Sequence, residues 1–401
     1  MQKGVTFPRG FLAGAGKARI KGDRADREDV ALIYSEVPAS AAGVFTRNLV
    51  RSAPVELTEE HLRRTAGRLR AVVANSGNAN ACNGLSGMEA ARRMAAAAAA
   101  ALNLTEDRIA VASTGVVGMP FPIAKAEAGI AAAARGLSGD GGSVAARAIM
   151  TTDTFAKETA ATFSCGGRVC SVGGMAKGSG MIHPDMATML AFLTTDAPVE
   201  PSALHLALTA AVKRTFNAVT VDGDTSPNDT VLVLANGVAG GEAIGTASPG
   251  YPLFAAALEE ACRDLSRQIA RDGEGATCLV EVRVEGADDE EQARRIARTV
   301  ARSPLVKAAV HGRDPNWGRI LVAAGYAGVP FDPARAAIFI GAVPVARNGT
   351  ALPFDEAAAG RELAAPEVCL RLVVGDGGGA ATAWGCDLSA EYVRINADYR
   401  S

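Results

Sequence analysis

One threonine stands where its hydroxyl could cut the chain. The segment 177–190 (KGSGMIHPDMATML) is rich in Gly, Ser and Pro, and it places Thr188 directly after the small residue Ala187. A hydroxyl in that position can attack the Ala187 carbonyl, and the new N-terminal threonine would carry a nucleophile and a base together. An α-amino group titrates near ~7.7–8, so it can accept the hydroxyl proton at neutral pH. The sequence therefore predicts self-cleavage between Ala187 and Thr188.

A turn that could stabilise an oxyanion follows a predicted strand. Residues 113–118 (STGVVG) come directly after the apolar run 108–113. A tight turn can present a backbone N–H, and a neighbouring hydroxyl such as that of Thr114 adds a second donor beside Gly115. Taken alone, the same residues also fit a plain glycine turn.

Four further motifs have both a functional and a structural interpretation. Residues 150–154 (MTTDT) place three hydroxyls around one carboxylate, a pattern typical of turns and caps. Residues 222–229 (DGDTSPND) lack the bidentate glutamate of a calcium loop, which favours a rigid, self-hydrogen-bonded loop. Glu274 lies between two glycines, where the backbone can approach a ligand closely, or it is simply exposed. His183 is an alternative base, but an N-terminal threonine supplies its own.

Composition narrows the class of protein. The 401 residues carry a net charge of −2 and only 5% aromatic residues, which argues against nucleic-acid binding and favours a small-molecule ligand. The seven cysteines are scattered without a Cys-x-x-Cys pair, and no His/Asp/Glu cluster has ligand spacing, so no metal site is expected. The cysteine usage, the N-terminus without an apolar signal and the lack of a membrane-length apolar run predict a cytoplasmic protein with no membrane partner.

The motifs fall on an irregular mixture of strands and helices. Strands are expected at 30–34, 42–45, 53–55, 69–74, 108–113, 189–193, 231–235 and 278–284, with a hairpin over 163–175. Helices are expected at 87–102, 122–135, 201–214, 253–272 and 290–302, and a loop at 136–142. The order lacks regular βαβ spacing, so it predicts an α+β fold in layers rather than a doubly wound parallel sheet.

Several segments in one order resemble the ornithine acetyltransferase family, the glutamate N-acetyltransferases of arginine biosynthesis. The resemblance covers nearly the whole chain. The matching segments are 9–11 (RGF), 42–48 (AGVFTRN), 75–82 (NSGNANAC), 113–115 (STG), 150–154 (MTTDT), 177–181 (KGSGM), 186–190 (MATML), 272–277 (DGEGAT), 314–319 (DPNWGR) and 392–396 (YVRIN). So many motifs in one order are far more specific than any one of them.

The resemblance implies an architecture and a processing step. Family members are precursors that cleave themselves, so residues 1–187 would form an α chain and residues 188–401 a β chain, pairing as an α2β2 heterotetramer. The implied fold is an α+β, sheet-on-sheet core flanked by helices, similar to the N-terminal-nucleophile aminopeptidases. A smaller C-terminal α/β subdomain is expected from about residue 285 to 401.

The resemblance also implies roles for particular residues. Thr188 matches the nucleophile, and Thr114 and Gly115 match the oxyanion donors. The substrate-binding positions of the family correspond to Thr154, Lys177, Thr188, Glu274, Asn396 and Ser401. Two positions depart from the family pattern: Ser401 replaces a threonine, and Cys278 stands where a lysine is common. These departures concern substrate preference rather than the nucleophile.

The implied reaction moves an acetyl group from N2-acetyl-L-ornithine to L-glutamate through an acetyl-threonine intermediate. It requires no organic cofactor and no metal, because the amide itself is the acyl donor. The sequence does not decide whether acetyl-CoA serves as a second donor, as it does in bifunctional members. Two alternatives remain at this point: an N-terminal-nucleophile aminopeptidase or amidohydrolase on the same fold, and a non-enzymatic oligomeric module.

Overall fold

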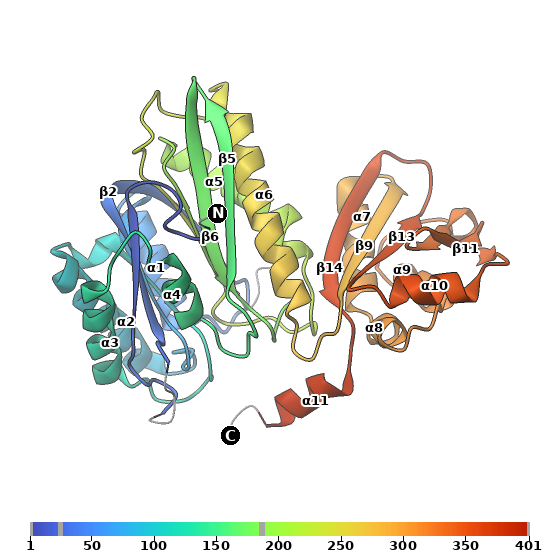
Figure 1. Cartoon of the computed structure of the whole chain (residues 1–401), viewed down its shortest axis with the longest axis horizontal. Coiled ribbons are helices and arrows are strands. Elements are labelled where there is room, and N and C mark those ends of the chain that lie inside the picture. Colours follow the sequence, from blue (N-terminus) through green and yellow to red (C-terminus); the bar gives the residue numbers. More distant parts are fainter. Residues whose placement is uncertain (1–2, 23–26, 184–188, 399–401) are drawn as a thin grey trace. The chain divides into compact units, whose positions relative to one another are not determined.

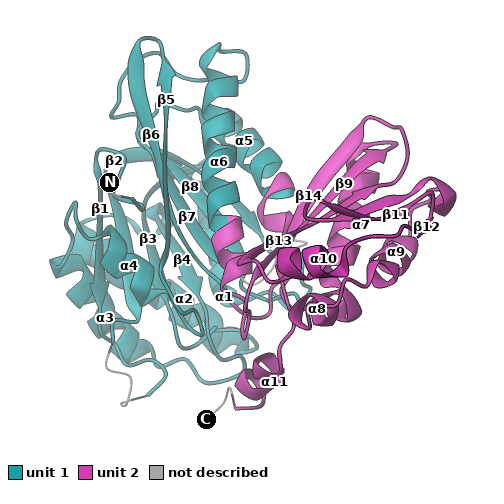
Figure 2. Cartoon of the chain, turned by 45° about the vertical axis from the view of Figure 1, so that its right-hand side comes forward, with its two compact units in different colours: residues 1–178, 185–213, 224–265 teal, residues 179–184, 214–223, 266–401 magenta. Residues whose placement is uncertain are grey.

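The computed structural model describes residues 3–22, 27–183 and 189–398. Ala187, Thr188 and Ser401 therefore lie outside the described residues. The chain forms two compact units, shown in different colours in Figure 2. Unit 1 comprises Met1–Gly178, Asp185–Lys213 and Asp224–Leu265, and unit 2 comprises Ser179–Pro184, Arg214–Gly223 and Ser266–Ser401.

Unit 1 is built on one eight-stranded mixed sheet. Its strands are β1 (Phe11–Gly16), β2 (Val30–Phe45), β3 (Arg68–Asn75), β4 (Ile109–Ser113), β5 (Lys157–Cys165), β6 (Arg168–Lys177), β7 (Leu190–Thr195) and β8 (Thr230–Ala235). Its helices are α1 (Ala53–Arg64), α2 (Gly84–Leu102), the short η1 (Glu106–Arg108), α3 (Ile123–Arg135), α4 (Gly142–Ala148), α5 (Pro201–Arg214) and most of α6 (Gly250–Arg271). The strand order is β4-β3-β2-β8-β7-β6-β5, with β1 added to β2.

The long strand β2 joins the two halves of this sheet. Residues 30–34 pair with β3, and residues 40–45 pair with β8. Val72 of β3 belongs to the same hydrophobic cluster as Phe192 of β7 and Leu232 of β8. Strands on both sides of β2 thus contribute to one hydrophobic core. Unit 1 is α+β, as the sequence predicts, and its layered core agrees with the one that the family resemblance implies.

Helices cover the outer faces of the folded sheet. Alternate residues of β3, such as Ala71 and Val73, point away from the inner core and pack with helices α2 and α3. On the other half, α6 lies against the β5–β6 hairpin, where the rings of Phe163 and Phe254 are 6.0 Å apart (Figure 1). The hairpin turns at Gly166 and Gly167, as expected, and both have positive φ.

Unit 2 contains a six-stranded sheet covered by helices. Its strands are β9 (Leu279–Ala287), β10 (Ala337–Ile340), β11 (Val343–Arg347), β12 (Thr350–Ala351), β13 (Glu367–Val373) and β14 (Gly379–Cys386). Its helices are η2 (Phe216–Ala218), α7 (Glu290–Arg302), α8 (Pro304–His311), α9 (Trp317–Gly325), η3 (Pro333–Arg335), α10 (Glu356–Leu363) and α11 (Ala390–Ala397). The order is β12-β11-β10-β13-β9-β14, in which only β13 and β9 are parallel. The inner face of α7 packs on the sheet through Ile296 and Val300.

One sequence-based expectation for secondary structure is wrong, and another is correct but incomplete. Residues 53–55 are not a strand but the first turn of α1, where Pro54 fits because the first helical N–H groups need no partner within the helix. The expected strands at 30–34 and 42–45 are two parts of the single strand β2. In addition, α4 was not foreseen, because the glycines before it indicate a loop. Among the described residues, no helix is both long and apolar enough to cross a bilayer.

Candidate active site

The turn after β4 presents two hydrogen-bond donors. Thr114 is 5% exposed and its backbone N–H donates to the Asn75 carbonyl oxygen at 3.0 Å. Within the described part of the chain, neither the Thr114 hydroxyl nor the Gly115 N–H has a hydrogen-bond partner. Gly115 has φ +131°, and a Cβ there would lie 2.3 Å from the Gly77 carbonyl carbon, so only glycine fits. The predicted oxyanion turn therefore leaves two neighbouring donors available.

A loop rich in asparagine holds this turn in place. The Asn75 Oδ1 atom accepts a hydrogen bond from the Ser113 hydroxyl at 2.6 Å. Asn228, 4% exposed, donates from Nδ2 to the carbonyl oxygens of Ala79 at 2.6 Å and of Ser113 at 2.8 Å. The 222–229 segment, expected to be hydrogen-bonded within itself, thus also bonds to segments more than a hundred residues away. Sequence reasoning did not assign Asn228 a role at the site, because it treated residues 222–229 as a loop bonded within itself.

The described chain resumes at Met189, one residue after the predicted nucleophile. Leu190 pairs with Thr230 in the parallel β7–β8 ladder and with Lys177 in the antiparallel β6–β7 ladder. The Met189 N–H donates to Asp229 Oδ1 at 2.9 Å, and its carbonyl oxygen accepts from the Thr230 N–H at 3.1 Å. Met189 is therefore fixed on both sides at the starts of two neighbouring strands.

Asn228 and Asp229 connect these two regions. Asn228 bonds to the Ser113 carbonyl just before the oxyanion turn, and Asp229 bonds to the N–H of Met189. Consecutive Cα atoms are 3.8 Å apart, so one dipeptide places the turn and the start of β7 close together. The structure thus brings the Thr114 turn next to the chain position that follows Thr188.

A buried cationic network lies at the end of β6. Lys177 is 3% exposed, and its Nζ lies 2.7 Å from Thr151 Oγ1 and 3.7 Å from Asp153 Oδ2. Lys157, with no exposed surface, places Nζ 2.7 Å from Asp153 Oδ1. The N–H groups of Thr151 and Gly178 also donate to the Asp153 carboxyl, at 3.0 and 2.7 Å. Lys177 is therefore held as a fixed cation.

Asp153 stays ionised in this network. Burial alone would raise its pKa, but the charges of Lys177 and Lys157 outweigh burial and hold the pKa well below its ordinary value. The residues 150–154 were interpreted from sequence as a turn or cap, with Thr154 as a substrate position. Thr154 is exposed, whereas Asp153 and Lys157, three residues beyond the motif, are buried, and sequence reasoning did not foresee their ion pair. Their spacing of four residues was the available signal.

Glu274 and Asn396 form a second polar group, in unit 2. Glu274 is 7% exposed, its N–H donates to the Ser179 carbonyl oxygen at 2.9 Å, and its Oε2 accepts from Asn396 Nδ2 at 2.8 Å. A Cβ on Gly180 would lie 2.3 Å from Glu274 Oε2, so the Glu274 carboxyl packs directly against this glycine. Asn396 is exposed on α11. These two predicted substrate positions lie together in the structure.

His183 is badly placed to act as a base. Its Nδ1 lies 3.0 Å from Thr220 Oγ1, and its Nε2 lies 3.3 Å from Nη2 of Arg298. A guanidinium can only donate, so Nε2 must accept and Nδ1 must carry the proton. Both ring nitrogens are thereby engaged, and the lone pair of Nε2 is occupied.

Cys278, one of the two departures from the family pattern, has an uncharged side chain. It is 5% exposed, and its N–H donates to Asp387 Oδ1 at 3.2 Å. Burial, helped by the nearby Asp387 carboxylate, raises the pKa of its thiol to about 12. The site of a common family lysine is therefore neutral at physiological pH.

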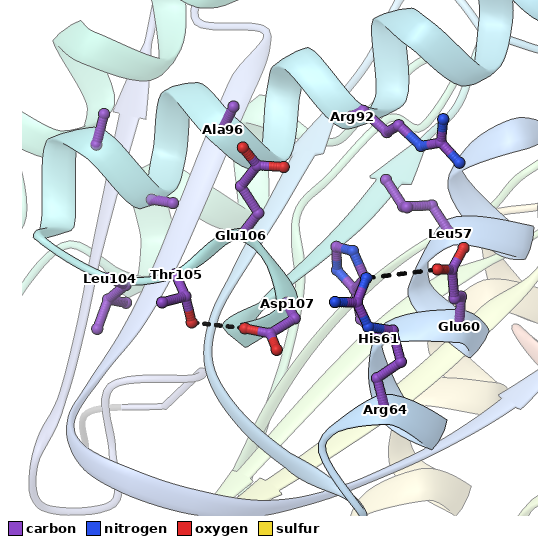
Figure 3. Close-up of a pocket in the computed structure, with 12 residues that line it drawn as sticks. Leu57, Glu60, His61, Arg64, Arg92, Ala96, Leu104, Thr105, Glu106 and Asp107 are labelled. Atoms are coloured by element: carbon purple, nitrogen blue, oxygen red, sulfur yellow. Dashed lines mark hydrogen bonds and ion pairs between the residues drawn. The ribbon is translucent and has the colours of Figure 1, made fainter.

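Within the described ranges, neither a metal-ligating cluster nor the pocket beside α1 coincides with the predicted site. Among the described residues, no group of three His, Cys, Asp or Glu side chains is arranged to hold a metal ion. A pocket of about 750 Å³ lies between α1, α2 and η1, lined among others by His61, Arg64, Arg92 and Asp107 (Figure 3). None of the predicted site residues lines it.

Comparison with known proteins decides the family. The ArgJ family model matches residues 12–401. The chain belongs to the ArgJ family. It is 55% identical over 398 residues to the arginine biosynthesis bifunctional protein ArgJ of Symbiobacterium thermophilum, covering 99% of this chain and 98% of that protein. The protein of the same name from Parasynechococcus marenigrum is 50% identical over 400 residues, covering 99% of this chain and 95% of the relative.

A solved structure agrees with this assignment. The crystal structure of the ArgJ protein from Bacillus halodurans has a TM-score of 0.51 and 44% identity, and the match covers 51% of this chain and 97% of that chain. The predicted family resemblance is therefore confirmed. The chain is an acetyltransferase of arginine biosynthesis, and the comparisons do not favour the aminopeptidase alternative.

Proposed function

We propose that this ArgJ-family chain cleaves itself between Ala187 and Thr188, and that Thr188 then carries an acetyl group from N2-acetyl-L-ornithine to L-glutamate. The observation that carries the proposal is the Asn228–Asp229 dipeptide. It ties a turn with two available donors to the residue directly after Thr188. A nucleophile and an oxyanion site must lie together for acyl transfer, and this dipeptide brings their chain positions together.

Cleavage begins when the Thr188 hydroxyl attacks the Ala187 carbonyl carbon. The peptide C–N bond breaks as the proton passes to nitrogen, leaving an ester that water hydrolyses. The products are an α chain ending at Ala187 and a β chain beginning with the free amine of Thr188. A chain of about half length in the crystal structure of the Bacillus halodurans relative supports this two-chain organisation.

Acetyl transfer then proceeds in two steps. The Thr188 amine takes the proton of its own hydroxyl, and the oxygen bonds to the acetyl carbon of acetylornithine. The Thr114 hydroxyl and the Gly115 N–H stabilise the oxyanion; losing one such donor typically costs about 3–4 kcal/mol. The ammonium protonates the ornithine nitrogen as the C–N bond breaks. The glutamate amine then takes the acetyl group from Thr188 by the same steps in reverse, which gives ping-pong kinetics.

The substrate groups match the charges that the chain fixes. Ornithine carries two amino groups and a carboxylate, so its site needs at least one anion and one cation. Glu274, bonded by Asn396, offers the anion, and Lys177, held by Asp153, offers the cation. Thr154 and Ser401 complete the proposed set of substrate positions. No organic cofactor or metal takes part, and acetyl-CoA is proposed as a second acetyl donor.

The assembly and location belong to the same proposal. We expect two α and two β chains in a heterotetramer, in the cytoplasm, which suits seven cysteines without a paired motif. The test begins with mass spectrometry and N-terminal sequencing of the purified protein, which should give two chains, one starting at Thr188. Acetylornithine with glutamate should then yield acetylglutamate and ornithine. Acetate release without glutamate would instead indicate a hydrolase, and comparing acetyl-CoA as donor decides the second activity.

A further inference from the structure

One buried carboxyl in unit 1 is only half satisfied. Asp229 has no exposed surface, and its Oδ1 accepts the Met189 N–H at 2.9 Å. Its Oδ2 is buried and has no hydrogen-bond partner among the described residues. The neighbouring Thr46 hydroxyl has a single proton, which it donates to the Ser226 carbonyl oxygen at 2.6 Å. A buried polar atom without a partner is costly, so it needs an explanation.

Covalent geometry identifies the group that this oxygen can meet. The Met189 nitrogen is bonded to the carbonyl carbon of Thr188, and the Thr188 nitrogen lies only three bonds away. Standard bond lengths keep the two nitrogens within roughly 3–4 Å of each other, whatever the torsion angle between them. Because Oδ1 lies 2.9 Å from the first nitrogen, the carboxyl is within reach of the second.

We propose that Asp229 is a positioning residue that holds the liberated α-amino group of Thr188 and stabilises the ammonium it becomes during acyl transfer. This inference rests on the proposed function. In the step concerned, the proton of the Thr188 hydroxyl moves to the amine while the oxygen bonds to the acetyl carbon. Asp229 takes no proton; its negative charge compensates the positive charge that forms, as a carboxylate does for imidazolium in a serine-protease triad.

The surroundings of Asp229 suit a group that waits for a cation. Burial raises the pKa of Asp229 well above its ordinary value, against the opposing effects of the Met189 N–H, the neighbouring Thr46 hydroxyl and the charge of Lys177. Lys177, on β6, is the titratable side chain in the described chain whose charge acts on Asp229, and it is already engaged by Asp153 and Thr151. The new amine would supply the missing positive partner after cleavage.

The test is Asp229→Asn in the full-length protein. Asparagine keeps the oxygen that accepts the Met189 N–H but removes the charge. We expect kcat/KM for acetylornithine to fall about 100-fold or more at its optimum. The acid limb of the pH profile of kcat/KM should move to lower pH by roughly 1–3 pH units. The reason is that an ammonium without its carboxylate loses its proton more easily. Cyanate carbamylates the unprotonated Thr188 amine. The pH dependence of this reaction, followed by mass spectrometry, should shift by the same amount.

Asp29→Asn is the matched control. Asp29 is a buried carboxyl of unit 1, 3% exposed, but both of its oxygens accept backbone N–H groups, from Ala18 and Ile20, each at 2.6 Å. The Asp29→Asn variant should be less stable, but neither the acid limb of its pH profile nor the titration of its Thr188 amine should move. Asp229→Glu keeps the charge and should restore most of the shift. If Asp229→Asn is not cleaved, Asp229→Ser, which also removes the charge, takes its place.

The outcomes separate the two proposals. An amine titration that is the same in wild type, Asp229→Asn and Asp229→Glu would overturn the role of Asp229, even if activity fell. If wild type is cleaved but transfers no acetyl group to glutamate, the proposed function fails while the amine titration still decides this inference. If wild type is never cleaved, no amine forms and both proposals fail together.

Discussion

Asp153 and Asp229 are two buried carboxyls of the same unit with opposite surroundings. Asp153 accepts hydrogen bonds from two backbone N–H groups and lies beside the ammonium groups of Lys157 and Lys177. Asp229 accepts a hydrogen bond from one N–H group, and its second oxygen has no hydrogen-bond partner among the described residues. The pKa of Asp153 is lowered and that of Asp229 is raised. Burial opposes charge at both positions, so the difference comes from their partners.

This difference gives the two carboxyls different roles. Asp153 is an anchor, which fixes another side chain, and Asp229 is a poised group, which is ready to bind a charge. Asp153 is satisfied before any substrate arrives, and its charge fixes the position of Lys177. Asp229 is unsatisfied in the described chain, and it binds Met189, whose neighbour Thr188 is the proposed new N-terminus. A fully paired carboxylate gives rigidity, whereas an unpaired one is ready for a charge that appears later.

The largest expected effect follows from removing Thr188, the proposed nucleophile next to the residue that Asp229 binds. Thr188→Ala should give an uncut chain with no acetyl transfer above background, because the variant has neither the nucleophilic hydroxyl nor the free amine. The measurements are a denaturing gel, the intact mass and the rate of acetylglutamate formation. Thr188→Ser is the control, and it should retain cleavage. A Thr188→Ala protein that still separated into two chains would remove Thr188 as the nucleophile.

The uncut Thr188→Ala protein then allows the two carboxyls to be compared directly by unfolding. Asp153→Asn leaves two buried ammonium groups without their anion and should cost about 3–5 kcal/mol at neutral pH, measured by urea titration. Asp229→Asn should cost far less or even stabilise, because it removes a buried carboxyl with an unsatisfied oxygen. Equal losses for both variants would contradict the contrast between anchor and poised group.

The contributions of Asp153 and Asp229 to the free energy of unfolding should change with pH in opposite directions. Asp153 has a folded pKa below its unfolded value of about 3.9, so its contribution is present above that pH and is lost as pH falls toward the folded pKa. Asp229 has a raised folded pKa, so the folded state keeps the proton longer and stability falls as pH rises above about 3.9. Subtracting each variant's unfolding free energy from that of the Thr188→Ala parent should show these two slopes.

Local patterns in the sequence predict most of the strands and turns around these carboxyls. The apolar runs gave β3, β4, β7 and β8 within a residue or two, and the paired glycines gave the β5–β6 turn. The strand followed by Ser113, Thr114 and Gly115 predicted a turn with available donors, because only glycine tolerates that backbone. Each of these features depends on neighbours in the chain.

The partners of the two carboxyls could not be found in this way. Asp153 meets Lys177 across 24 positions, and Asn228 reaches the Ser113 carbonyl across 115. The spacing of residues along the chain does not reveal such contacts, because they arise when the sheet pairs strands that are distant in the sequence, such as β2 and β8. The error at 53–55 has a local cause, since three apolar residues fit a strand as well as the first turn of a helix.

A smaller effect is expected from the carboxyl of unit 2. Glu274→Gln should lower kcat/KM for acetylornithine by about 10- to 100-fold, in line with ~1.5–3 kcal/mol for a hydrogen bond to a charged group. Self-cleavage should be unaffected, because Glu274 is proposed to bind substrate and not to serve Thr188. The intact mass after purification and steady-state kinetics check both parts. Unchanged kinetics would exclude Glu274 from the substrate site.

The smallest effect should come from the residue that orients Glu274. Asn396 Nδ2 donates to Glu274 Oε2 at 2.8 Å from the exposed face of α11, so the bond is partly open to competition from water. Asn396→Ala should therefore raise KM for acetylornithine only a few-fold, with little change in kcat. If Asn396 acts through Glu274, the double variant with Glu274→Gln should be no worse than Glu274→Gln alone. Fully additive losses would instead mean that Asn396 binds the substrate by itself, independently of the carboxyl.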